Sequence, residues 1–142
     1  MLTKQEQQLL SILRTNARAS ISDLARVLNL SRSTVQNRIN KLEESGVISG
    51  YVVQYGNEYQ NTLVSSHVSI KVKQKLTART NVELRQISEI SELYAISGEY
   101  DLIGIVQAQS LEQLSHILDN IGNLDGVDRT NSAVVLETKF KR

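Results

Sequence analysis

The stretch "SRSTVQNRINKLEESG", residues 31–46, has the pattern of a helix with one apolar and one polar side. Its apolar stripe, at 3.6 residues per turn, is formed by Val35, Ile39 and Leu42. Ser31 can cap the first turn, and Gly46 can close the last one. We therefore expect a helix that packs on one side and presents hydrogen-bonding groups on the other.

Two further helices are predicted before this one. Thr3 with Glu6, and Ser20 with Asp23, have the spacing of a capping box, and each pair precedes leucines at helical spacing. The link "LNLS" contains Asn29, a residue type that tolerates the left-handed conformation of tight turns. The order and spacing predict a three-helix helix-turn-helix domain.

The polar side of the third helix suits binding to the major groove of DNA. Arg32 can bind guanine or phosphate, and Gln36 and Asn37 can bind adenine edges. The first-turn hydroxyls lie where free N–H groups and the helix dipole favour phosphate. The candidate DNA-binding residues are Ser31, Arg32, Ser33, Thr34, Gln36, Asn37, Arg38 and Lys41. The alternative is an ordinary solvated helix face.

The distribution of charge favours the DNA-binding interpretation. The chain has 142 residues and a net charge of +1, but residues 1–50 hold seven Lys or Arg against four acids. Between Leu24 and Leu42 there are four basic residues and no acidic one. A polyanion is the partner that such an imbalance indicates.

Composition excludes several other classes of protein. The chain has no cysteine, which rules out disulfides and thiolate metal sites, and its start lacks the apolar core of a signal peptide. No apolar run approaches the roughly 20 residues that span a bilayer. We therefore expect a soluble, cytoplasmic protein that does not bind membranes.

The second half of the chain alternates strands with helices. Strands are predicted at "VSIKV" (68–72), "LYAIS" (93–97), "LIGIVQA" (102–108) and "AVVLETKF" (133–140). Helices are predicted to start at the capping boxes Thr80–Glu83 and Ser110–Gln113, and "GEYD" reads as a hairpin turn. The order βαββαβ is that of ferredoxin-like folds, so the whole chain is of the α+β class.

A β-prone connection, residues 47–61, separates the two halves and is predicted to contain one strand and a loose segment. The expected domains are 1–50 for the helix-turn-helix, 51–62 for a linker strand and loop, and 63–142 for the second domain. In the second domain, the strand at 102–108 is apolar on both sides. Helices cover one face of such a sheet, so a second copy of the chain is expected to cover the other as a homodimer.

Three segments resemble the Lrp/AsnC transcription regulators: "DLARVLNLSRSTVQNRINKLEESGVISGY", "SGEYDLIGIV" and "GVDRTNSAVVLE". The resemblance covers nearly the whole chain in the same order. It implies a winged or extended helix-turn-helix, a βαββαβ sensing domain, and dimers that assemble into octamers or other higher forms. It also implies amino acids as effectors, bound between dimers.

The resemblance places the effector site at two segments. Glycine lets a ligand approach the backbone, and a carboxylate at the turn could accept from an α-ammonium group. The candidate effector-binding residues are Gly98, Glu99, Tyr100, Asp101, Thr130, Asn131 and Ser132. Many family members have aspartate at the position of Glu99. The alternative for residues 98–101 is a simple tight turn.

Other chemistries have little support in the sequence. His67 and His116 are far apart in sequence and lack cysteine partners, so no metal site and no cofactor are expected. The chain has no P-loop, dinucleotide-binding fingerprint or nucleophile elbow, so it is not expected to be an enzyme. The main alternative to a sequence-specific regulator is an architectural DNA-binding protein of low specificity without an effector.

Overall fold

The structure is a computed structural model and describes residues 1–141. The chain divides into two compact units, Met1–Gln54 and a second that begins at Tyr55. We call the first unit the head. The expected domain boundaries, at residues 50 and 62, remain predictions.

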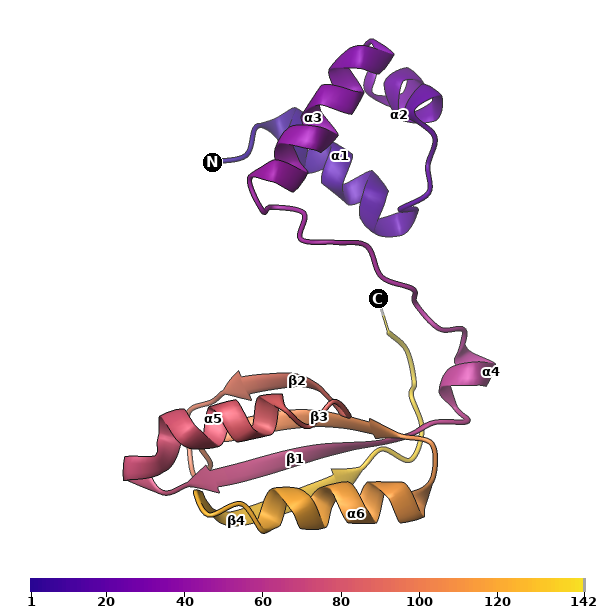
Figure 1. Ribbon diagram of the computed structural model, residues 1–142. Coiled ribbons are helices and arrows are strands. Elements are labelled where there is room, and N and C mark those ends of the chain that lie inside the picture. The colour runs from indigo at the N-terminus through magenta and orange to yellow at the C-terminus, as the bar shows by residue number, and fades with distance from the viewer. Residues whose placement is uncertain (142) are drawn as a thin grey trace. The chain divides into compact units, whose positions relative to one another are not determined.

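The head consists of three helices around one apolar core. They are α1 (Lys4–Thr15), α2 (Ile21–Leu28) and α3 (Arg32–Glu44), as Figure 1 shows. The buried apolar residues come from all three helices: Leu9, Leu13, Leu24, Ala25, Val35, Ile39 and Leu42. The apolar stripe predicted for α3 is therefore confirmed as the side that packs against α1 and α2.

Most of the predicted helix ends are confirmed. Thr3 and Glu6 form the complete capping box at the start of α1. Ser20 caps α2, but Asp23 pairs with Arg26. Asn29 ends α2 in the left-handed conformation, with φ +55°, and Gly46 follows α3 with φ +79°.

The strand predicted within residues 47–61 is not formed. The connection runs without strand pairing to the short helix α4 (Asn57–Gln60). Val52 and Val53 are 93% and 82% exposed. A β-prone sequence forms a ladder only where another strand supplies hydrogen bonds, and no described segment does so here.

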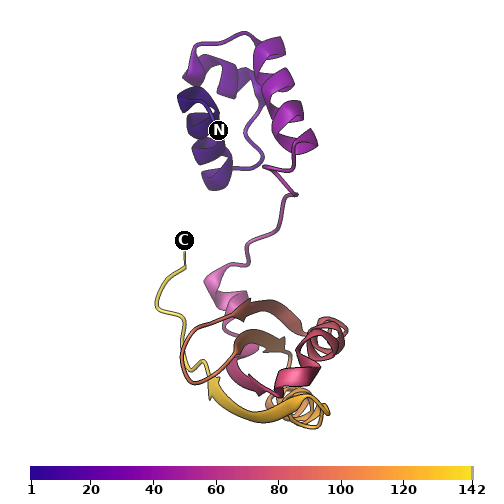
Figure 2. The same ribbon diagram turned by 90° about the vertical axis from the view of Figure 1, so that its left-hand side faces the viewer.

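The second unit has the predicted βαββαβ order. Its elements are β1 (Val64–Val72), the 3₁₀ turn η1 (Gln74–Leu76), α5 (Thr77–Arg85), β2 (Ile90–Ala95), β3 (Leu102–Ala108), α6 (Leu111–Gly122) and β4 (Val127–Val134). The strands form one antiparallel sheet in the order β2-β3-β1-β4. Figure 2 shows α5, in pink, and α6, in yellow, on the same side of this sheet.

The start of α5 was predicted wrongly. Thr80 is not a cap but a fully buried residue inside the helix, where its hydroxyl donates to the Leu76 carbonyl at 2.7 Å. Gly126 makes room for it, because a Cβ built at Gly126 would lie 1.8 Å from Thr80 Oγ1. Ser110 does cap α6 as expected, although the Gln113 side chain accepts from Gln109 N–H rather than completing the box.

The last strand lies earlier than predicted. Its register along β1 runs from the Val72–Val127 pair to the Ser66–Val134 pair. Val135 adds one more hydrogen bond, to the Ser65 carbonyl at 2.8 Å, and β1 begins at Val64. The strand predicted at residues 133–140 therefore ends early, at Val134, close to the start of β1.

The sheet has one covered and one open face. Leu102 and Val106 of β3 are buried under the helices, whereas Ile103 and Ile105 point to the other face and remain half-exposed. No helix among the described residues of this unit covers that second face. The prediction that β3 is apolar on both sides is confirmed.

Candidate functional site

The outer side of α3 carries the predicted DNA-binding residues. Two of these residues, Thr34 and Arg38, are half-buried. The other six are exposed: Ser31, Arg32, Ser33, Gln36, Asn37 and Lys41. The apolar side of the same helix anchors it to the head, as described above. Because α3 is a continuous helix, its exposed side chains form one surface along 13 residues.

Hydroxyl groups gather at the start of α3. Ser31 caps the helix by accepting from the Thr34 N–H at 3.2 Å, and the two hydroxyl oxygens lie 2.7 Å apart. The Ser33 hydroxyl lies 3.2 Å from that of Ser31. The first turn of α3 contains no acidic residue, so nothing within that turn opposes an approaching anion.

Asn40 also belongs to the polar side of α3, where it contacts Gln36, and sequence reasoning missed it. The Gln36 Nε2 donates to Asn40 Oδ1 at 2.9 Å, which leaves the Gln36 carbonyl oxygen available as an acceptor. The spacing of four residues on a helix could have revealed this pair.

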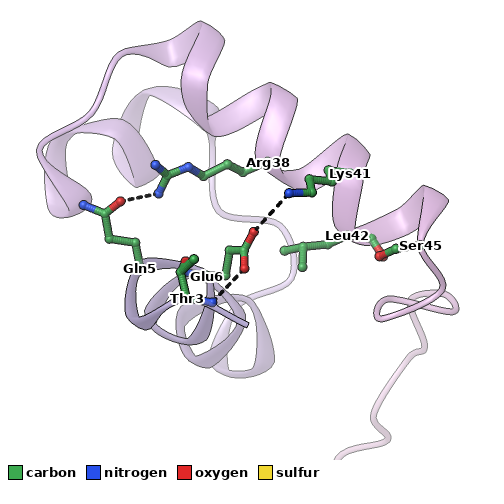
Figure 3. Close-up of polar contacts among 7 residues, drawn as sticks. All are labelled: Thr3, Gln5, Glu6, Arg38, Lys41, Leu42 and Ser45. Carbon is green, nitrogen blue, oxygen red and sulfur yellow. Dashed lines mark hydrogen bonds and ion pairs between the residues drawn. The ribbon is translucent and has the colours of Figure 1, made fainter. Parts of the chain in front are cut away.

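A cleft of about 410 Å³ lies between the start of α1 and the middle of α3. Its lining residues are Thr3, Gln5, Glu6, Thr34, Asn37, Arg38 and Lys41. Figure 3 shows that α1 holds two cations of α3 here: Arg38 Nη1 donates to Gln5 Oε1 at 2.6 Å, and Lys41 Nζ lies 4.0 Å from Glu6 Oε1. No sequence signal pointed to Gln5 in this role, and Glu6 was predicted only as part of a cap.

The predicted effector turn is a real hairpin connection between β2 and β3. Gly98 has φ +110°, and the Ile96 N–H donates to the Asp101 carbonyl at 3.0 Å. Asp101 also binds β1, because its N–H donates to the Ile70 carbonyl and its carboxylate accepts from the Val72 N–H at 2.8 Å. Asp101 therefore has a structural role in closing this end of the sheet.

Arg129 joins the turn to β4 and was missed by sequence reasoning. Its guanidinium donates to Glu99 at 2.7 Å and lies 5.3 Å from the centre of the Tyr100 ring. Lys71, also missed, lies 3.7 Å from the Asp101 carboxylate. The turn thus contacts the end of β1 and the start of β4 through charged groups.

The second predicted effector segment follows Arg129 on β4. Thr130, Asn131 and Ser132 pair with Ile70, Ser69 and Val68 of β1. Because side chains alternate along a strand, Asn131 shares the open face of the sheet with Arg129. Thr130 and Ser132 lie on the side of the buried Ile70 and Val68, so the three residues do not converge on one point.

No group of three His, Cys, Asp or Glu residues among residues 1–141 is placed to hold a metal ion. Over the same residues, no helix combines the length and apolar character needed to cross a membrane.

Two family models match the chain. Residues 65–142 match the model described as the Lrp/AsnC ligand binding domain, and residues 2–49 match one described as a winged helix-turn-helix DNA-binding domain. The chain belongs to the Lrp/AsnC family. It is thus a transcriptional regulator in which a DNA-binding head precedes a ligand-binding domain, as the sequence predicted.

Individual relatives agree with this assignment. The HTH-type transcriptional regulator FL11 of Pyrococcus abyssi is 31% identical over 137 residues, which cover 96% of this chain and 91% of that protein. The structure of AsnC from Escherichia coli is similar with a TM-score of 0.88 at 25% identity, covering 100% of this chain and 97% of that one. A Neisseria meningitidis regulator solved as a complex with L-Met has the same fold, with a TM-score of 0.88 at 23% identity over 100% of this chain and 94% of that one.

Proposed function

We propose that this regulator reads specific DNA sequences by placing α3 in the major groove. The observation that carries the proposal is the continuous exposed polar side of α3, formed while Val35, Ile39 and Leu42 fix its back in the core. A groove about 12 Å wide admits such a helix. Arg32, Gln36 and Asn37 would contact bases, and the hydroxyls, Arg38 and Lys41 would contact phosphates.

The experiment is a selection of bound sequences from a random duplex pool, with and without a mixture of amino acids. Enrichment of a roughly palindromic site is expected, because two heads of a dimer would enter major grooves about 34–36 Å apart. A pool that stays random after repeated rounds would favour the alternative, an architectural binder of low specificity.

We further propose that an amino acid binds near the turn at Gly98–Asp101 and the segment Thr130–Ser132. The α-ammonium group would pair with Glu99 or Asp101, and the α-carboxylate with Asn131 and the Arg129 guanidinium, which share the open face of the sheet. The L-Met complex of the Neisseria meningitidis relative supports this class of ligand. Since Glu99 already pairs with Arg129, a ligand would bind by replacing that ion pair.

A thermal-shift screen of the twenty standard amino acids tests the effector. Regulation requires that the ligand favour one assembly or one head spacing over another, because equal affinity for both states changes neither population. A shift with one or a few amino acids, together with altered DNA binding, is expected. No shift with any of them would remove the amino-acid effector from the proposal.

The open face of the sheet supports assembly into a homodimer, with higher forms such as an octamer built from it. Half-exposed Ile103 and Ile105 would be buried by the second copy. Light scattering coupled to gel filtration gives the mass, and Ile105→Lys should shift it towards the monomer. The protein is proposed to act in the cytoplasm, on chromosomal DNA, without enzymatic activity.

A further inference from the structure

The two cations at the cleft of the head are held by different chemistry. Arg38 donates to Gln5, a neutral amide, and keeps its full charge for any partner. Lys41 faces Glu6, a carboxylate, across 4.0 Å (Figure 3). The side chain of Lys41 is 77% exposed, and that of Glu6 is 10% exposed. A nearly buried negative charge therefore lies beside an exposed positive one.

Two contacts with Thr3 fix the position of Glu6. The Thr3 N–H donates to Glu6 Oε2 at 2.8 Å, and the Glu6 N–H donates to Thr3 Oγ1 at 3.1 Å. The backbone hydrogen bond is the main cause that lowers the pKa of Glu6 below its ordinary 4.5; burial opposes it, and the nearby Lys41 and Arg38 assist it. Glu6 is thus ionised at neutral pH, and its Oε1 is the oxygen that faces Lys41.

Three of the described residues that line the cleft are charged. Glu6 carries the negative charge, and Arg38 and Lys41 carry the positive ones. A DNA phosphate bound to Lys41 would be separated from this carboxylate only by the Lys41 ammonium group. An exposed ion pair adds little to folding stability. The effect of Glu6 on an approaching phosphate is repulsive, and it requires no direct contact with DNA.

We propose that Glu6 is a positioning residue that limits the sequence-independent affinity of the head for DNA, by holding Lys41 and offsetting part of its charge. The proposal rests on the phosphate contact proposed above for Lys41. A phosphate bound to Lys41 would lie about 7 Å from the Glu6 carboxylate. In water, the repulsion between two like charges at that distance lowers the affinity about threefold. The carboxylate thereby lowers the affinity that every duplex gains from this phosphate contact, whatever its sequence.

The experiment uses the full-length protein and a random-sequence duplex at low salt. Glu6→Gln removes the charge but keeps a side chain that can complete the capping box. Glu44→Gln, at the exposed end of α3, removes the same charge from the head away from the cleft lining. Both changes are made in the native background and together with Lys41→Met, and circular dichroism verifies folding.

Glu6→Gln is expected to tighten random-duplex binding about threefold in the native background, more than Glu44→Gln does. With Lys41→Met, the gain from Glu6→Gln should fall to the level of Glu44→Gln. A damaged fold would weaken binding, so a gain cannot come from lost structure. Unchanged or weaker binding of folded Glu6→Gln, or an equal gain with Lys41→Met, overturns the proposal.

Lys41→Met alone separates this proposal from the one on which it rests. If it weakens binding to random duplex, the phosphate contact holds, and the Glu6 variants decide the further inference. If it leaves binding unchanged, the phosphate contact of Lys41 is wrong, and the role of Glu6 fails with it. The groove contacts proposed for Arg32 and Gln36 are tested independently by the sequence selection.

Discussion

The two candidate sites are built in different ways. The candidate DNA-binding surface lies on one continuous helix, α3, whose exposed side chains need only that helix to be folded. The candidate effector site combines a turn, the end of β1 and the start of β4, and its charged groups already pair with one another. A site on one helix can be read from local sequence, whereas a site assembled from three segments depends on tertiary contacts.

The largest effect is expected from removing core volume in one unit at a time. Leu9 and Leu84 are fully buried in the head and the second unit, respectively. Leu9→Ala should destabilise the head by about 2–5 kcal/mol and abolish DNA binding, while amino-acid binding persists. Leu84→Ala should reduce amino-acid binding instead. Urea unfolding with both binding assays provides the measurement, and loss of both activities in Leu9→Ala would contradict the comparison.

Substitutions on α3 should separate base contacts from phosphate contacts. Arg32→Ala should erode the preference for the selected site over random duplex by about 1–3 kcal/mol, because a base contact is lost. Lys41→Ala should weaken binding to all sequences alike. Titrations of both duplexes at several salt concentrations measure this. If Arg32→Ala leaves both affinities unchanged, the role given to Arg32 is wrong.

The turn can be strained without touching the head. Gly98 has φ +110°, a backbone conformation that costs a β-branched residue about 1–3 kcal/mol. Gly98→Val should therefore remove the thermal shift caused by the effector while DNA affinity in its absence stays the same. Gly50→Val is the control, since a Cβ there meets no atom within 4 Å and its φ is ordinary. A normal effector response in Gly98→Val would place the ligand elsewhere.

The smallest effect concerns acid stability of the head. The pKa of Glu6 is lower in the folded head than its ordinary 4.5, so ionised Glu6 stabilises the folded head. This contribution to the free energy of unfolding is fully present above about pH 4.5. It is lost as the pH falls through the lower, folded-state pKa. Acid titration of ellipticity should show a weaker pH dependence for Glu6→Gln than for the native protein or Glu44→Gln. Coincident curves for all three would show that the shift is absent.

The sequence predicted local features well. The caps at Thr3, Ser20, Ser31 and Ser110 depend on residues three positions apart, and strand β3 has apolar residues on both of its faces. These features need little information from the rest of the chain. The fold class followed from the order of such elements.

The features that the sequence did not predict depend on distant contacts. The polar residues of β4 form a strand because β1 supplies its hydrogen bonds, and Thr80 is buried because Gly126 lies against it. The contact between Glu6 and Lys41 joins α1 to α3, which are separated in sequence by α2. The effector-binding residues, including Thr130 to Ser132, stay predictions.

The left-handed backbone at Asn29 has a consequence for how this regulator can change. It sets the direction in which α3 leaves α2, and the Leu30 N–H strengthens the turn by donating to the Ala25 carbonyl at 2.9 Å. The orientation of α3 thus depends on a short turn that lies outside its exposed positions. If α3 binds the major groove as proposed, those positions can change toward a new operator while the approach of the helix to the duplex stays the same.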